Sequence, residues 1–166
     1  MVSCAVEPAK QRQSQFPKKG SFRKSENLVF TMKRSEAREQ AFLLVFEKSF
    51  HGYEIPEAIE AAMQARELTG DAFMEQLAEG VFAHLDEIDE AIESHCIGWK
   101  KARIPRVSLS IMRLCVYELM YEKDIPDSVS INEAVELAKR FANEDDAVYI
   151  NGVLGAIQRE KEGAGQ

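Results

Sequence analysis

The sequence predicts an all-α fold of about seven helices with no strands, and three observations support this. Apolar residues recur at helical spacing throughout the chain after residue 32. Proline, glycine and capping residues punctuate these segments at plausible helix starts and ends. The one hairpin-like dipeptide, Asn151-Gly152, is flanked by residues of helical period, so we interpret it as helix rather than as a turn between strands.

The first 31 residues differ from the rest of the chain. They contain Pro8, Pro17 and Gly20, show no apolar periodicity, and carry six basic against two acidic side chains. We interpret residues 1–31 as a disordered basic extension. An organelle transit peptide is a weaker alternative, and an upstream extension with Met32 as the working N-terminus is the favoured interpretation.

Four helices are expected between residues 32 and 99. The first begins near Ser35, which we expect to cap it, and ends at His51-Gly52. The other three fit residues 56–67, 71–85 and 86–99. The inward positions predicted for the four helices include Ala37, Ala41, Leu44, Val45, Phe73, Leu77, Val81, Leu85, Ile88 and Ile92, and Asp71 is the predicted cap of the third helix.

The second half of the chain begins after a proline. Pro105 disfavours helix at Ile104, so we place a boundary there between two subdomains, residues 32–104 and 105–166. Residues 109–122 are apolar nearly all round, which predicts a helix buried on several sides at the centre of the second half.

Two further helices are expected to complete the second half. Ser130 and Glu133 have the spacing of a capping box, from which a helix runs to Phe141. The last helix, roughly 145–160, contains Gly152. Because a glycine inside a helix costs about 1 kcal/mol relative to alanine, we expect Gly152 to permit the close approach of a neighbouring helix.

Charge and composition exclude several classes of protein. The formal net charge is −7, and the basic extension leaves the remaining residues at −11. Such a body repels nucleic acid and anionic membranes at long range, which argues against nonspecific binding to either. No apolar run approaches the ~18 residues of a membrane helix. The three cysteines form no CxxC pair, so neither a disulfide framework nor a zinc site is suggested, and a reducing cytoplasm is the simplest location.

No pattern of catalytic residues is present. His51, His84 and His95 are scattered, and structural roles are favoured over metal binding. Nucleophile, zinc-protease, phosphate-loop and calcium-loop signatures are absent from the sequence. We therefore predict that the protein is not an enzyme and holds no cofactor.

Three surface segments are candidates for binding. Lys33, Arg34 and Arg38 form a basic cluster, in which the two arginines share a helix face and oppose the helix dipole. This cluster is either a phosphate contact or ordinary solvated charge. A basic loop of Lys100, Lys101, Arg103 and Arg106 beside Trp99 could bind phosphate and stack a base, although a partly buried tryptophan with a solvated loop is favoured. Acids in "NEDDAVYINGVL" are explained by helix capping alone.

Two C-terminal segments carry a family resemblance. "IMRLCVYEL" and "IPDSVSINEAVELAKRFANEDDAVYINGVL" closely resemble the NusB family of bacterial transcription antitermination factors. "KRSEAREQAFLLVF" resembles the Arg-rich N-terminal helix of that family, so the resemblance spans about residues 32–158. It implies an all-helical fold of two three-helix-type subdomains and agrees with a start at Met32.

The resemblance also implies partners and site residues. The implied partner is the ribosomal protein NusE, with which the protein would bind boxA-type single-stranded RNA and join an antitermination complex on RNA polymerase, notably on ribosomal RNA operons. A homodimer is left open. The implied RNA-binding residues are Lys33, Arg34, Arg38, Phe46 and Tyr149, and the implied partner-binding residues are Glu144 and Asp145.

This sequence departs from the family pattern in ways that bear on RNA binding. Ser35 and Glu36 interrupt the basic run, Leu43 replaces a common glutamine, and Val148 replaces a common lysine. Each change removes a polar contact, so we expect weak RNA binding by the isolated chain and tighter binding with a basic partner. The alternative is a helical protein–protein adaptor with little RNA affinity of its own.

Overall fold

The computed structural model describes residues 32–50, 55–66, 70–96 and 101–164. Within these ranges the chain forms seven α-helices and one short 3-10 helix, and no strand, so the all-α prediction is confirmed. The extension 1–31, the expected helix end at His51-Gly52, and Trp99 lie outside the described residues. The elements are α1 (Arg34–Lys48), α2 (Ile55–Arg66), α3 (Ala72–Ala83), α4 (Leu85–His95), η1 (Lys101–Arg103), α5 (Arg106–Tyr121), α6 (Asp127–Phe141) and α7 (Glu144–Ala164).

Two helices begin at side chains that cap them. The carboxylate of Asp71 accepts hydrogen bonds of 3.0 Å from the backbone N–H groups of Phe73 and Met74, as predicted. The amide oxygen of Asn143 accepts from the backbone N–H of Asp146 at 2.8 Å and so caps α7. Both bonds satisfy N–H groups that the first turn of a helix leaves without internal partners.

Two expected caps are wrong. α1 begins at Arg34, before Ser35, and the residue at its N-cap is Lys33, which makes no capping side-chain bond. α6 begins at Asp127, directly after Pro126, whose φ of −59° and ψ of 133° end the preceding turn. Ser130 therefore lies inside the helix rather than at its start, and its hydroxyl is free to bond to a neighbouring helix.

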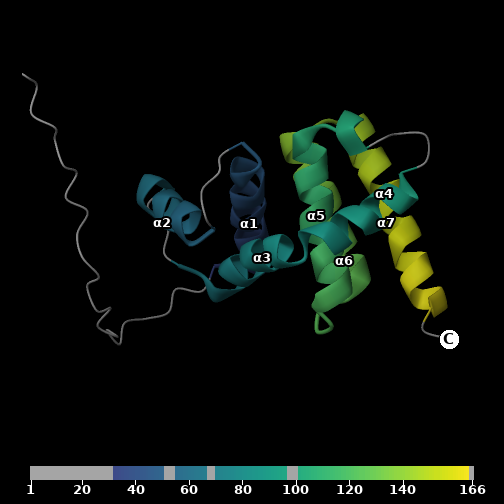
Figure 1. Cartoon of the computed structure of the whole chain (residues 1–166), viewed down its shortest axis with the longest axis horizontal. Coiled ribbons are helices and arrows are strands. Elements are labelled where there is room, and N and C mark those ends of the chain that lie inside the picture. The colour runs from purple at the N-terminus through teal and green to yellow at the C-terminus, as the bar shows by residue number, and fades with distance from the viewer. Residues whose placement is uncertain (1–31, 51–54, 67–69, 97–100, 165–166) are drawn as a thin grey trace, which may run out of the picture.

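Helix α5 lies at the centre of the molecule. It packs against α1, α3, α4, α6 and α7, and Figure 1 shows α1 and α3 to its left and α4 and α7 to its right. Ten of its residues are buried, which agrees with the apolar pattern of the sequence on all sides. The proposed division into subdomains at residue 104 remains a prediction, and α4 packs on α5 and α7.

The close helix approach occurs at Gly80 and not at Gly152. A Cβ atom added to Gly152 would meet nothing within 4 Å, and this residue is exposed. A Cβ added to Gly80 in α3 would lie 2.1 Å from Cζ of Tyr117 in α5. The expectation for Gly152 is wrong because its position on α7 faces solvent, whereas Gly80 allows α3 to lie against the tyrosine ring.

We predict opposite effects of alanine at these two glycines. Gly80→Ala should lower the free energy of unfolding by about 1–3 kcal/mol, since the methyl group overlaps the buried Tyr117 ring. Gly152→Ala should raise it by up to about 1 kcal/mol, because alanine is the better helix former at an open position. Urea unfolding followed by circular dichroism measures both, and equal effects would contradict the placement of α3 against α5.

Candidate nucleic-acid interface

The exposed cations of the basic cluster are Lys33 and Arg34, at the start of α1. Both residues are exposed. The guanidinium carbon of Arg34 lies 4.1 Å from the centroid of the Phe73 ring in α3, so a cation–π contact orients this side chain. The two residues place positive charge at one end of α1, where a phosphate group can approach from solvent.

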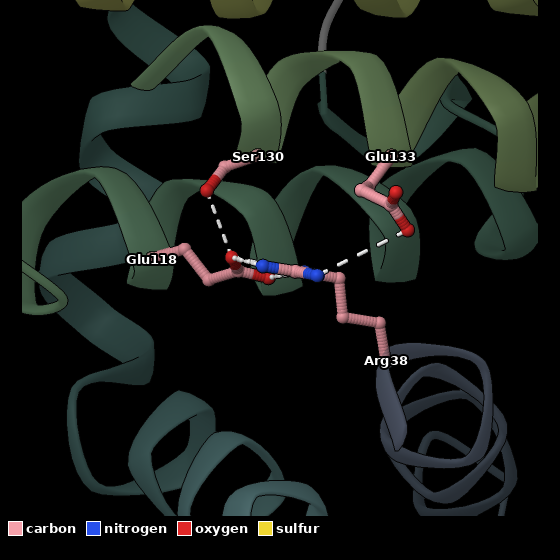
Figure 2. Close-up of polar contacts among 4 residues, drawn as sticks. All are labelled: Arg38, Glu118, Ser130 and Glu133. Atoms are coloured by element: carbon pink, nitrogen blue, oxygen red, sulfur yellow. Dashed lines mark hydrogen bonds and ion pairs between the residues drawn. The ribbon is translucent and has the colours of Figure 1, made fainter. Parts of the chain in front are cut away.

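The third cation of the cluster, Arg38, lies inside the molecule. Only 4% of the residue is exposed. Its Nε donates to Oε1 of Glu118 at 2.8 Å and its Nη2 donates to Oε2 at 2.9 Å, which forms a bidentate pair between α1 and α5 (Figure 2). The hydroxyl of Ser130 in α6 donates to the same Oε2 at 2.8 Å. Glu133 adds a carboxylate oxygen 4.0 Å from Nη1 of the arginine.

Arg38 is therefore not an exposed phosphate contact, and its expected place on the RNA-binding surface is wrong. The apolar spacing of α1 already indicated that Arg38 is buried, because Arg38 shares a helix face with the buried Phe42 and Val45. Glu118 was a second indication of a buried ion pair, since a carboxylate in a helix that is apolar nearly all round needs a positively charged partner. Ser130 and Glu133, which the sequence suggested as a capping box, instead surround this ion pair (Figure 2).

A cleft between α1 and α6 adjoins the exposed cations. Lys33 lines it together with acidic and basic side chains of both helices. Arg140 donates to the carboxylate of Glu39 across the cleft. Lys139 donates to Glu136 at 2.8 Å, and this hydrogen bond raises the pKa of Lys139. Lys139 and Arg140 on the α6 side of the cleft are thus paired with acidic side chains, and Lys33 lines its α1 side.

The remaining predicted site residues lie along α1 and at the start of α7. Phe46 is half-buried, and its ring packs against Phe42 with centroids 6.1 Å apart. Tyr149 is half-buried in a hollow that Pro105 and Asp145 also line. Burial, with a hydrogen bond to Cys96, raises the pKa of Tyr149 to about 12, so its hydroxyl stays protonated at neutral pH.

Two predicted partner-binding residues lie in the first turn of α7. Glu144 and Asp145 are both exposed. Carboxylates in this turn interact favourably with the helix dipole, and they are also available to a basic partner. The structure brings Asp145 and Tyr149 together at one hollow, whereas Lys33 and Arg34 lie at the N-terminal end of α1.

The described residues contain no group of three or more histidine, cysteine or acidic side chains arranged to hold a metal ion. Of the basic loop after α4, Arg103 and Arg106 are exposed, while Lys100 lies outside the described residues. None of the helices described here is long and apolar enough to cross a membrane.

Comparison with known proteins identifies similar sequences. The sequence profile of the NusB family matches residues 35–159. The chain is 44% identical over 131 residues to the transcription antitermination protein NusB of Bacillus subtilis, an alignment that covers 79% of this chain and 98% of the relative. It is 39% identical over 142 residues to NusB of Clostridium botulinum, and this alignment covers 76% of this chain and 99% of the relative.

Solved structures resemble the fold as well. NusB of T. maritima has a TM-score of 0.70 and 29% identity, over 78% of this chain and 93% of that one. A crystal structure of the antitermination factors NusB and NusE in complex with double-stranded RNA has a TM-score of 0.69 and 28% identity. The match covers 76% of this chain and 96% of the matched chain. This chain therefore resembles both solved structures in sequence as well as in fold.

We predict that Arg38→Ala will destabilise the protein by about 3–5 kcal/mol, because it leaves the buried carboxylate of Glu118 without its counter-charge. Arg34→Ala, one turn earlier and exposed, should change the free energy of unfolding by less than about 0.5 kcal/mol. Urea unfolding of the two variants beside wild type measures the difference. The double variant Arg38→Met/Glu118→Leu should recover much of the loss, since it removes both charges.

Proposed function

The chain belongs to the NusB family of transcription antitermination proteins, and we propose that it binds boxA-type single-stranded RNA jointly with NusE. The observation that carries this proposal is the exposed pair Lys33 and Arg34 at the start of α1, of which Arg34 is oriented by Phe73, on a body with a net charge of −11. In this role it joins an antitermination complex on RNA polymerase, acts in the cytoplasm and catalyses no reaction.

The small number of exposed cations in the basic cluster favours an RNA complex that includes a second protein. Each phosphate contact on a single strand contributes about −0.7 to the dependence of log affinity on log salt. Two cations therefore supply a slope of only about −1.4, and the body carries a charge of −11 outside the basic extension. A basic partner reduces the repulsion and extends the row of phosphate contacts.

The acidic surface offers such a partner two regions. Glu144 and Asp145 lie exposed at the start of α7. The outer face of α4 carries a second group of exposed acids, which are Asp86, Glu87, Glu90 and Glu93. NusE is a ribosomal protein, and ribosomal proteins are generally basic, so electrostatic complementarity favours a pair of unlike chains over a homodimer.

The second candidate function is a protein–protein adaptor with little RNA affinity. The burial of Arg38 favours it, because this removes one of the three cations that the sequence assigned to RNA. The two functions differ in whether Lys33 and Arg34 alter RNA binding by the protein pair.

We predict that the variant Lys33→Ala/Arg34→Ala will bind NusE as wild type does, and that the pair will bind boxA RNA more weakly, with a salt slope smaller by about 1.4. RNA affinity is measured at several salt concentrations, with and without NusE. Wild type alone should bind weakly, because residues 32–166 carry a net charge of −11.

Lys161→Ala provides a matched control, since Lys161 is an exposed cation on α7 that pairs with Asp127. It should leave both the RNA affinity and the salt slope unchanged. An unchanged slope for the double variant would instead favour the adaptor function.

A further inference from the structure

An exposed aromatic ring and an arginine meet at the other end of α1. The guanidinium carbon of Arg106, at the first position of α5, lies 4.5 Å from the centroid of the Phe50 ring. Its Nη1 donates to the backbone carbonyl of Ser49 at 3.1 Å. The edge of this ring also meets Phe46, with centroids 5.0 Å apart. These contacts fix the orientation of the Phe50 ring.

The exposure of Phe50 is unusual for so large an apolar side chain. Of its surface, 53% remains exposed, and it is the one aromatic residue among the large hydrophobic side chains that are exposed in the described part of the chain. Full burial of a phenylalanine is strongly favourable. The contacts that hold this ring leave it partly in water, where a flat ligand can reach it.

The positive charge of Arg106 is unusual at the start of a helix. Arg106 is exposed and opens α5, where the partial positive charge of the helix N-terminus opposes a basic side chain. A ligand phosphate would relieve this opposition, since it is attracted by both the guanidinium group and the helix dipole. An aromatic ring for the base and an arginine for the phosphate are the two elements with which proteins bind single-stranded nucleic acid.

We propose that Phe50 and Arg106 form a stacking platform for a base of the same single-stranded RNA that contacts Lys33 and Arg34. This inference rests on the proposed function and extends it along α1. The helix has 15 residues and is therefore about 22 Å long. For a strand with stacked bases, whose rise is about 3.4 Å per nucleotide, about six nucleotides connect its two ends. The helix thus sets a minimum length for tightly bound RNA.

The surroundings favour one orientation of the strand. Pro105, which precedes the arginine, lines the hollow that also contains Asp145 and Tyr149. A carboxylate repels phosphate but accepts hydrogen bonds from the amino groups of cytosine and adenine. The bases therefore face the ring and the hollow, while the phosphates face the guanidinium group of Arg106.

The test compares Phe50→Leu, which keeps an apolar side chain but removes the flat ring, with Phe50→Tyr, which keeps the ring. Each is paired with NusE and titrated with a boxA RNA of about 12 nucleotides and a truncated RNA of about four. Phe50→Leu and Arg106→Ala should each weaken binding of the long RNA about tenfold, and binding of the short RNA less than twofold. Phe50→Tyr should bind as wild type does. Val129→Ser, which alters another exposed apolar side chain on α6, is the control that should change neither.

Three results would overturn the platform. One is normal binding of the long RNA by Phe50→Leu, and another is an equal loss for both RNAs, which would indicate a general effect on α1. The third is a loss of NusE affinity, which would assign the ring to a protein contact. The Lys33→Ala/Arg34→Ala variant separates these results from failure of the proposed function, because it should weaken binding of both RNAs.

Discussion

The buried pair of Arg38 and Glu118 determines how four helices are arranged. Removing a guanidinium group and a carboxylate from water is costly unless nearly all their hydrogen-bonding groups find partners. Here the bidentate pair joins α1 to α5, and the hydroxyl of Ser130 in α6 donates to the same carboxylate. The guanidinium carbon of Arg38 also lies 5.3 Å from the centroid of the Phe73 ring in α3. These partners fix the rotation of α1 about its own axis. Arg34, one turn earlier, consequently emerges beside α3 at the surface.

This arrangement separates the charges of α1 by function. One arginine holds the helix in place, and the neighbouring cations remain available in solvent. Other bidentate contacts act in the same structural way, as Arg113 of α5 does when it binds Asp89 of α4 with two hydrogen bonds of 2.8 Å. Residues 32–166 nevertheless carry a net charge of −11. In the proposed function, a basic partner supplies the further phosphate contacts that this chain does not provide.

Local patterns predicted the helices well, and contacts between helices poorly. Apolar spacing located all seven helices, and Asp71 was identified as a cap because its bond lies within one turn. Ser130 and Glu133 matched a capping box, yet Ser130 donates to Glu118 of the preceding helix and Glu133 lies near Arg38 of α1, which local spacing cannot reveal. Gly152 and Gly80 are similar in sequence context, and only packing distinguishes them. Burial removes Arg38 from the exposed cations of the predicted site, and the contact between Phe50 and Arg106 could not be recognised before the fold was known.

The sequence separation within the buried pair has a consequence for synthesis of the protein. Arg38 and Glu118 are 80 residues apart. At a translation rate of roughly 5–20 residues per second, the arginine is added to the chain several seconds before its counter-charge. Throughout that interval its guanidinium group is best solvated by water, so α1 cannot settle into its final position. Helix α1 is thus synthesised early but takes its final position late, after most of the chain has emerged.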